Sequence, residues 1–320
     1  MRTWFLGVLI ACGGQTTAPS DGGTSDSPTP SFDMTFAVNR IYLGEVDRTT
    51  NAPSTTAWKS YGLNIDGLLT TGTSTDVCTL AAGASKAEQI DGNNGIDNVW
   101  GSTLLPIFQS AASLQTPSAS ATDAMVQGRT TLLVRVAGMT DDPSQTASGL
   151  KVRVVAGGTY PGTPSFDPTT SWPVLSGATA TDFDATITNG VLATSPGAPL
   201  VVTVPIGGAV VSLTIHHPII LFTHTGHTNI TNGTIAGVLD TNEFIAEFDA
   251  IAGYFSTSLC GSAKDGVDQE CRKASEILVD GTNHAGTPCT GLSIGIGFDA
   301  VLVGEPGAPA AIDGPPDPCP

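Results

Sequence analysis

The sequence predicts a mainly β fold, an antiparallel and jelly-roll-like β-sandwich with about three helices packed at one end. Several segments alternate apolar and polar residues with the period of two that half-buried strands require. The helical spacing of apolar residues occurs in three places along the chain. Strands and helices do not alternate regularly, which argues against a doubly wound parallel sheet.

Alternation of apolar and polar residues marks the predicted strands. In one of them, Arg135 faces away from the valines on either side of it, as a period of two requires. Asn189 and Gly190 form the turn signal of a hairpin. A loop rich in Asp, Pro, Ser and Gly over 140–149 predicts a second hairpin. The predicted strands are residues 35–44, 131–139, 150–158, 200–217 and 293–303, with the first hairpin over 184–192.

Apolar stripes and start signals mark the predicted helices. Residues 240–255 carry four apolar side chains on one stripe, and Asp240 followed by Glu243 resembles a capping box. Residues 264–281 begin with acids and stop before a glycine. The third helix follows the stretch 91–97, because the apolar residues after it have helical spacing.

The chain is predicted to hold one folded domain between two less structured ends. Residues 1–11 are expected to be a lipoprotein signal peptide, and residues 12–32 a tether rich in Gly, Ser, Thr and Pro. Residues 33–305 form the single β-rich domain, and residues 306–320 form a tail rich in Pro and Gly. The tether has too few apolar residues to offset the entropy lost on ordering it.

The N-terminus resembles a bacterial lipoprotein signal. Arg2 precedes a short apolar run, which ends in the tetrad LIAC at Cys12. This tetrad resembles a lipobox, in which the peptidase cuts before a cysteine that already carries a diacylglycerol. The resemblance implies lipid attachment at Cys12, with fatty-acyl groups such as palmitate, and a membrane as the first partner of the chain. Gly13, rather than Asp, then implies the outer membrane or the cell surface. The alternative is an ordinary secretory signal with a chance cysteine.

Composition limits the partners of the domain. Charged residues make up 13% of the chain, its net charge is -17 and its pI is about 4.3. Such an acidic chain argues against binding to nucleic acid, whose phosphates require Lys and Arg, and against docking on anionic lipid. Divalent cations remain compatible partners, although acidity also serves solubility.

The cysteines predict disulfides. The sequence has six, and lipidation of Cys12 would leave five, an odd count with one thiol left over. An exported chain meets oxidising conditions, in which disulfides form. No C-x-x-C pair occurs, so zinc ribbons and thioredoxin-type sites are excluded. Cys260 and Cys289 bracket a predicted helix, and we expect them to pair.

Two further motifs, one typical of catalysis and one of transition-metal binding, are weak evidence for those functions. The segment GLSIG matches the nucleophile elbow at Ser293, but a strand pattern follows it and no histidine occurs beyond His284. Residues 216–227 contain four of the five histidines. His216 and His217 point to opposite faces of any strand, so we interpret this segment as a polar turn rather than a zinc or copper site.

The stretch DGNNGIDNVWGSTLLP, residues 91–106, offers a candidate calcium site. Asp91, Asn93 and Asp97 supply oxygen ligands at alternate positions, between glycines that bend the loop. An EF-hand is excluded by the residues at its sixth and twelfth positions. An irregular site, completed by a distant residue such as Asp66, stays open. The alternative is a turn whose Asn or Asp caps the following helix, which we prefer.

Several short segments resemble uncharacterised surface lipoproteins of myxobacterial type. They are WKSYGLNIDGLLT (58–70), Cys78, residues 91–106, TNGTIAGVLDTNEFI (231–245) and SIGIGFDA (293–300). This family implies a surface location and brings no established activity, substrate or catalytic residue.

These observations predict an exported, lipid-anchored cell-envelope protein. The domain is expected to be a non-catalytic module that binds a glycan or protein, or serves structurally. Exposed aromatic residues, with Trp58, Tyr61 and Trp172 as candidates, would favour binding. The alternative is an extracellular hydrolase that acts on glycan or peptide, with paired carboxylates in a cleft.

Overall fold

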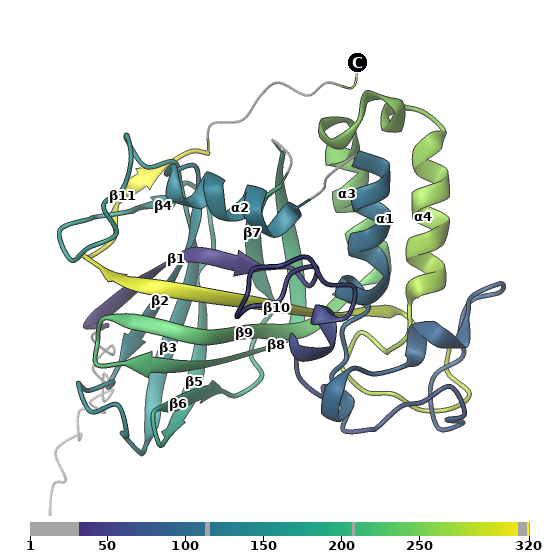
Figure 1. The fold of residues 1–320 in the computed structure, drawn as a ribbon, viewed down its shortest axis with the longest axis horizontal. Coiled ribbons are helices and arrows are strands. Elements are labelled where there is room, and N and C mark those ends of the chain that lie inside the picture. The colour runs from purple at the N-terminus through teal and green to yellow at the C-terminus, as the bar shows by residue number, and fades with distance from the viewer. Residues whose placement is uncertain (1–31, 113–115, 207–208, 313–318, 320) are drawn as a thin grey trace, which may run out of the picture. The chain divides into compact units, whose positions relative to one another are not determined.

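Eleven strands of the domain belong to one sheet (Figure 1). The computed structural model describes residues 32–112, 116–206, 209–312 and 319, all within one unit that spans residues 31–320. The strands are β1 (Met34–Tyr42), β2 (Thr131–Ala137), β3 (Ala147–Gly157), β4 (Pro173–Leu175), β5 (Thr181–Thr188), β6 (Val191–Thr194), β7 (Leu200–Ile206), β8 (Ala209–Thr225), β9 (Asn229–Asp240), β10 (Gly291–Val303) and β11 (Gly307–Ala310).

Most of this sheet closes on itself. Strand β3 pairs with β2 along one edge and with β5 along the other, and both pairings are antiparallel. The remaining antiparallel pairs continue the ring from β5 through β6, β8, β9, β10 and β1 back to β2. Strand β7 lies beside the ring as a partner of β8, and β11 pairs in parallel with β4. Closure removes the edges at which strands of the ring could pair with another chain.

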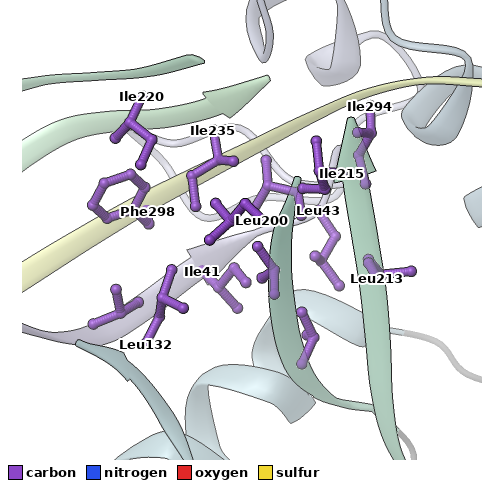
Figure 2. Close-up of a cluster of buried hydrophobic side chains, with 14 of the residues drawn as sticks. Ile41, Leu43, Leu132, Leu200, Leu213, Ile215, Ile220, Ile235, Ile294 and Phe298 are labelled. Atoms are coloured by element: carbon purple, nitrogen blue, oxygen red, sulfur yellow. The ribbon is translucent and has the colours of Figure 1, made fainter. Parts of the chain in front are cut away.

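The interior of the ring holds the main hydrophobic core. Alternation is strict in β5, where every second side chain is buried and the others are exposed. Side chains from β1, β2, β7, β8, β9 and β10 converge in the same cluster (Figure 2). Figure 2 labels Ile41, Leu43, Leu132, Leu200, Leu213, Ile215, Ile220, Ile235, Ile294 and Phe298 within it.

Strand β8 pairs with two different strands along one of its edges. Its first half pairs with β7 and its second half with β6, and a bulge lies between His216 and Ile219 in its pairing with β9. Pro218 lies in that bulge and lacks the N–H that a ladder position would need. The predicted strand 200–217 is therefore two strands, β7 and the start of β8.

Three of the four α-helices gather at one end of the strands (Figure 1). Aromatic side chains hold two of them together, since Phe108 lies 5.0 Å from Phe248 between ring centroids. The remaining helix, α2, packs on β1 and β7. The helices are α1 (Leu105–Ala112), α2 (Pro117–Val126), α3 (Thr241–Phe255) and α4 (Ala263–Ala274).

The prediction of a mainly β fold is confirmed, and the arrangement as a jelly-roll-like sandwich is not. The described strands follow one continuous path of pairing, because β3 joins β2 to β5 and closes the sheet. The predicted Pro- and Gly-rich tail, residues 306–320, contains one short strand. Residues 307–310 form β11, whose backbone pairs with β4.

Helix predictions succeed where local signals decide. Helix α3 begins after Asp240, whose carboxylate accepts hydrogen bonds from the N–H groups of Asn242 and Glu243. Helix α4 ends at Ala274, several residues before the predicted stop, because Ile277 pairs with Gly291 instead. Helix α2 is not among the predicted helices, because its Pro, Ser and Ala composition carries no apolar stripe.

Candidate functional site

The stretch 91–106 forms a turn, one π-helical turn and the start of α1. Asn94 adopts a left-handed conformation with φ of 57°, and the π-turn spans Trp100–Leu104. Asn98 lies two residues before the π-turn, whose cap position is Val99, and Asn98 Oδ1 accepts a hydrogen bond of 2.9 Å from the N–H of Gly101. An Asn side chain of the stretch therefore bonds to the first turn, as the preferred alternative expected. The carboxylates of Asp91 and Asp97 have other partners.

Four carboxyl groups lie close enough to act on one another's pKa values, and they form a carboxyl cluster: Asp66, Asp91, Asp97 and Glu276. Asp97 and Glu276 are only 4% and 5% exposed. Backbone N–H groups hold the cluster in place. Asp97 Oδ2 accepts from Ile65 at 2.6 Å, and Glu276 Oε1 accepts from Ser293 at 2.9 Å.

Burial makes this cluster retain protons. Burial first, and then the charges of Glu276 and Asp66, raise the pKa of Asp97 to about 9. Burial also raises the pKa of Glu276 to about 8, against the hydrogen bonds from Ser293 that lower it. The pKa of Asp91 rises to about 6 because of burial. Both shifts favour the protonated forms of Asp97 and Glu276.

The structure brings together two of the three predicted calcium ligands. Asp91 and Asp97 share the cluster, and Asp66 joins them as the sequence suggested. Asn93 does not, because it is exposed and donates to Ser60 Oγ at 3.0 Å. Carboxylate oxygens suit calcium. As they stand, however, no three His, Cys, Asp or Glu side chains are arranged to hold a metal ion in the described part of the chain.

Sequence reasoning missed the residues that organise the cluster. Glu276 follows α4 and lay inside the predicted helix. Asn283 lies on the next loop and donates to Asp66 Oδ2 at 3.1 Å and to the carbonyl of Glu276 at 3.2 Å. No sequence signal links these positions, because each contact joins segments that only the fold brings together.

Ser293 is a core residue of β10. It is fully buried, and its Oγ accepts a hydrogen bond of 2.9 Å from the N–H of Val99. Its own N–H donates to Glu276. These contacts agree with the interpretation of the GLSIG match as a chance one.

The histidines of β8 and its turn separate into different surroundings. His216 Nε2 lies 2.7 Å from Glu243 Oε2, and His217 is exposed. His227 contacts a carboxylate on the loop before β3. His224 is 1% exposed, and neither of its ring nitrogens has a partner among the described residues. Burial, followed by the charge of His227, lowers the pKa of His224.

Two disulfides form among the described residues, and neither is the predicted pair of Cys260 and Cys289. Cys289 bonds to Cys78, and Cys260 bonds to Cys319. The loops that carry Cys289 and Cys78 lie side by side, since the N–H of Cys289 donates a hydrogen bond of 3.0 Å to the Thr79 carbonyl. Cys271 is the buried free thiol, and burial raises its pKa to about 12.

The aromatic residues proposed for a binding face lie in different places. Tyr61 and Trp172 are buried, and Tyr61 donates to the carbonyl of Val46 at 2.8 Å. Trp58 is half-buried and lines a surface hollow of about 320 Å³. Of the three candidates, Trp58 alone remains open to a ligand.

The predicted lipid site, Cys12, and the signal peptide lie outside the described residues. Within the described ranges, no helix combines the length and the apolar character needed to cross a membrane. Comparison with protein-family models, with curated proteins and with solved structures gives no match.

Proposed function

We propose that the chain is an exported, lipid-anchored protein of the outer membrane or cell surface. Its folded domain would be a non-catalytic module that binds a glycan or protein, or serves structurally. The lipobox-like tetrad ending at Cys12 supplies the attachment point for the lipid. The resemblance to surface lipoproteins of myxobacterial type supports the same location.

The disulfides are the observation that carries the proposal of export. Cys78–Cys289 and Cys260–Cys319 join segments that are 211 and 59 residues apart in the chain. Structural disulfides persist in oxidising compartments and are rare in the cytosol. The buried free thiol of Cys271 is compatible with this, because its raised pKa leaves it unreactive.

A binding module is preferred over a hydrolase because of where the carboxyl groups lie. A glycosidase needs two carboxyl groups facing a cleft, with a sugar between them. Here Asp97 and Glu276 are buried beneath loops and bonded to backbone N–H groups. The hydrolase, acting on glycan or peptide, stays the alternative, since closely placed carboxyl groups with raised pKa values also occur in active sites.

The lipid anchor is tested by labelling cells with a fatty-acid analogue. We expect label on the wild-type chain and none on Cys12→Ser, because the thiol is the acceptor of the lipid. Equal label on the two chains would contradict the anchor. As a second expected result, the wild-type chain stays in the membrane fraction and the Cys12→Ser chain moves to the soluble fraction.

The function class is tested by profiling the purified chain against glycans and envelope components. Saturable binding without turnover supports the module. Release of product from a glycan or peptide, lost on Glu276→Gln, would instead support the hydrolase.

A further inference from the structure

The hollow beside Trp58 has the size of a small ligand site. It lies between the loop after β1, the short helix Ala57–Ser60 that carries Trp58, and the beginning of α1. Its volume of about 320 Å³ is at the lower end of the range for ligand pockets, roughly 300–1,000 Å³. The lining residues are Gly44, Glu45, Pro53, Ser54, Thr55, Trp58, Gly101, Ser102, Pro106 and Gln109.

The floor of this Trp58 hollow is fixed by two glycines. A Cβ on Gly101 would lie 2.7 Å from Trp58 Cβ, and a Cβ on Gly44 would lie 2.9 Å from Gly101 Cα. Gly44 also has φ of +126°, a conformation that residues with a Cβ rarely adopt. The two backbones and the tryptophan thus pack more closely than any side chain would allow.

Asn98 and the π-turn contact the backbone and Cβ of Trp58. Asn98 Nδ2 donates to the carbonyl of Trp58 at 3.3 Å, and Asn98 Oδ1 accepts from the N–H of Gly101 at 2.9 Å. Gly101 and Ser102 belong to the π-turn, and π-turns within helices are frequent at functional sites. The backbone and Cβ of Trp58 are therefore held in place without a ligand, which lowers the entropy lost on binding.

The lining combines one aromatic face with hydroxyl groups. Ser54, Thr55 and Ser102 supply hydroxyls that can donate or accept hydrogen bonds. Glu45 is the charged residue of the lining, and its two oxygens accept from Ser118 N and Oγ at 2.6 and 2.7 Å. The lining contains no basic side chain, and Lys59 Nζ, outside that lining, lies 5.5 Å from the centroid of the Trp58 ring.

We propose that the Trp58 hollow binds a neutral carbohydrate residue. A sugar ring has an apolar C–H face, which would stack on the Trp58 indole, and a rim of hydroxyls, which would bond to Ser54, Thr55 and Ser102. The size of the hollow fits one sugar residue or the end of a chain. This inference rests on the proposed binding function and names its ligand class.

Tryptophan fluorescence of the purified full chain tests this inference, in a detergent that has no sugar headgroup. Trp100 and Trp172 are buried, so quenching by a sugar would come from Trp58 among the described tryptophans. The probes are neutral oligosaccharides of glucose, mannose and N-acetylglucosamine, with oligogalacturonate as the acidic comparison. Equilibrium dialysis with labelled oligosaccharides repeats the measurement on variants that lack the indole.

At least one neutral oligosaccharide should bind saturably, and Trp58→Ala should weaken it by at least about tenfold. Trp58→Phe should retain part of the affinity, which separates loss of stacking from loss of fold. Ser102→Ala should cost about two- to tenfold, as one hydrogen bond is lost. Leu69→Ala is the control, because Leu69 is 70% exposed and lies outside the hollow, and it should bind as the wild type does.

If no neutral oligosaccharide binds at concentrations up to about 10 mM, the carbohydrate inference is overturned. Binding that Trp58→Ala leaves unchanged, or a preference for oligogalacturonate, would also overturn it. None of these three results bears on the lipid anchor or on a protein-binding role, since fatty-acid labelling and profiling against envelope proteins test those separately.

Discussion

Asp97 illustrates how a single residue can have one role in the sequence pattern and another in the fold. Its spacing from Asp91 is that of calcium ligands, and its position suggests a helix cap. In the structure it is a buried acid whose neighbours are Asp66 and Glu276. Burial first, and then the charges of these neighbours, raise the pKa of Asp97 and so determine how it affects stability.

The buried carboxyl groups should make the domain less stable as pH rises. The folded-state pKa values of Asp97 and Glu276, about 9 and about 8, lie above the value of roughly 4 for unfolded chains. Between these limits the folded state holds protons that the unfolded state has released, so unfolding becomes easier as pH rises. The denaturant midpoint, measured in chelator, should be lower at pH 9 than at pH 6.

Asp97→Asn should flatten this pH dependence, because the amide does not titrate. One retained proton corresponds to a slope of up to about 1.4 kcal/mol per pH unit. Asp76→Asn serves as the control, since Asp76 is exposed, and it should keep the wild-type slope. A wild-type midpoint that rises over this range would contradict the buried, protonated cluster.

Trp100→Ala should destabilise the domain more than Asp91→Ala. Trp100 is buried against Phe108 and Phe244, with ring centroids 5.8 and 6.0 Å away, and such truncations cost about 3–5 kcal/mol. Asp91 accepts a hydrogen bond from the N–H of Thr70, worth about 0.5–1.5 kcal/mol. Thermal melting of both variants measures the difference.

The same melting experiment tests calcium, since we expect the domain to fold without it. The wild-type melting temperature should be the same in calcium and in chelator. A sharp fall in chelator, together with an Asp91→Ala variant that no longer responds, would show that Asp91 holds the ion. Asn93→Ala should leave either result unchanged, because Asn93 lies outside the cluster.

At the scale of the element, β10 shows why small residues alternate along a strand. A Cβ on Gly295 would lie 2.4 Å from the Tyr61 carbonyl oxygen and 2.6 Å from Gly62 Cα. The glycine therefore lets the loop after the short helix pack directly on the outer face of the strand. The sequence pattern SIGIG predicted a strand, and the reason for its glycines is a contact with a loop more than 230 residues earlier.

Gly295→Ala should destabilise the domain by about 1–3 kcal/mol or more, because the clash is with backbone atoms that cannot move aside. Gly266→Ala in α4 is the matched control. A Cβ there meets nothing within 4 Å, so the change should stabilise the helix by about 0.5–1 kcal/mol. Denaturant unfolding of both variants measures whether the free energy of unfolding falls for Gly295→Ala and rises for Gly266→Ala. Equal effects would contradict the packing of the loop on β10.

At the scale of the whole molecule, the two disulfides constrain the unfolded chain to different degrees. The chain-entropy model gives about 5 kcal/mol for the separation of 211 residues and about 4 kcal/mol for 59 residues. Replacing Cys78 and Cys289 with alanine should therefore lower the midpoint of unfolding more than replacing Cys260 and Cys319.

Cysteine-to-alanine double variants and reduction of the wild-type chain measure these losses. Cys271→Ala provides the control, because Cys271 forms no disulfide, and it should respond to reductant as the wild type does. A Cys260→Ala and Cys289→Ala chain should lose both bonds, since these residues belong to different pairs. Loss of only one bond would contradict the pairing.

Local patterns in the sequence predicted most elements of the domain. The stripe of α3, the Asn189-Gly190 hairpin and the alternating strands are properties of neighbouring residues, and they persist in the structure. Where a local sequence signal conflicts with a contact to a distant residue, the distant contact determines where the element begins or ends. Helix α4 stops early because Ile277 pairs with Gly291, and the first turn of α2 is bonded to the distant Glu45 through Ser118.

By itself, the sequence determined the mainly β class, the positions of most strands and helices and the expectation of disulfides, because these depend on periodicity and composition. Only the tertiary structure decided that the strands close into a ring, which cysteines pair, and which carboxyl groups meet. Closure depends on β3 having two partners, and the cluster depends on Asp66, Asp97 and Glu276 coming together from distant parts of the chain. Such contacts leave no local pattern, since their energy comes from burial that only the folded chain provides.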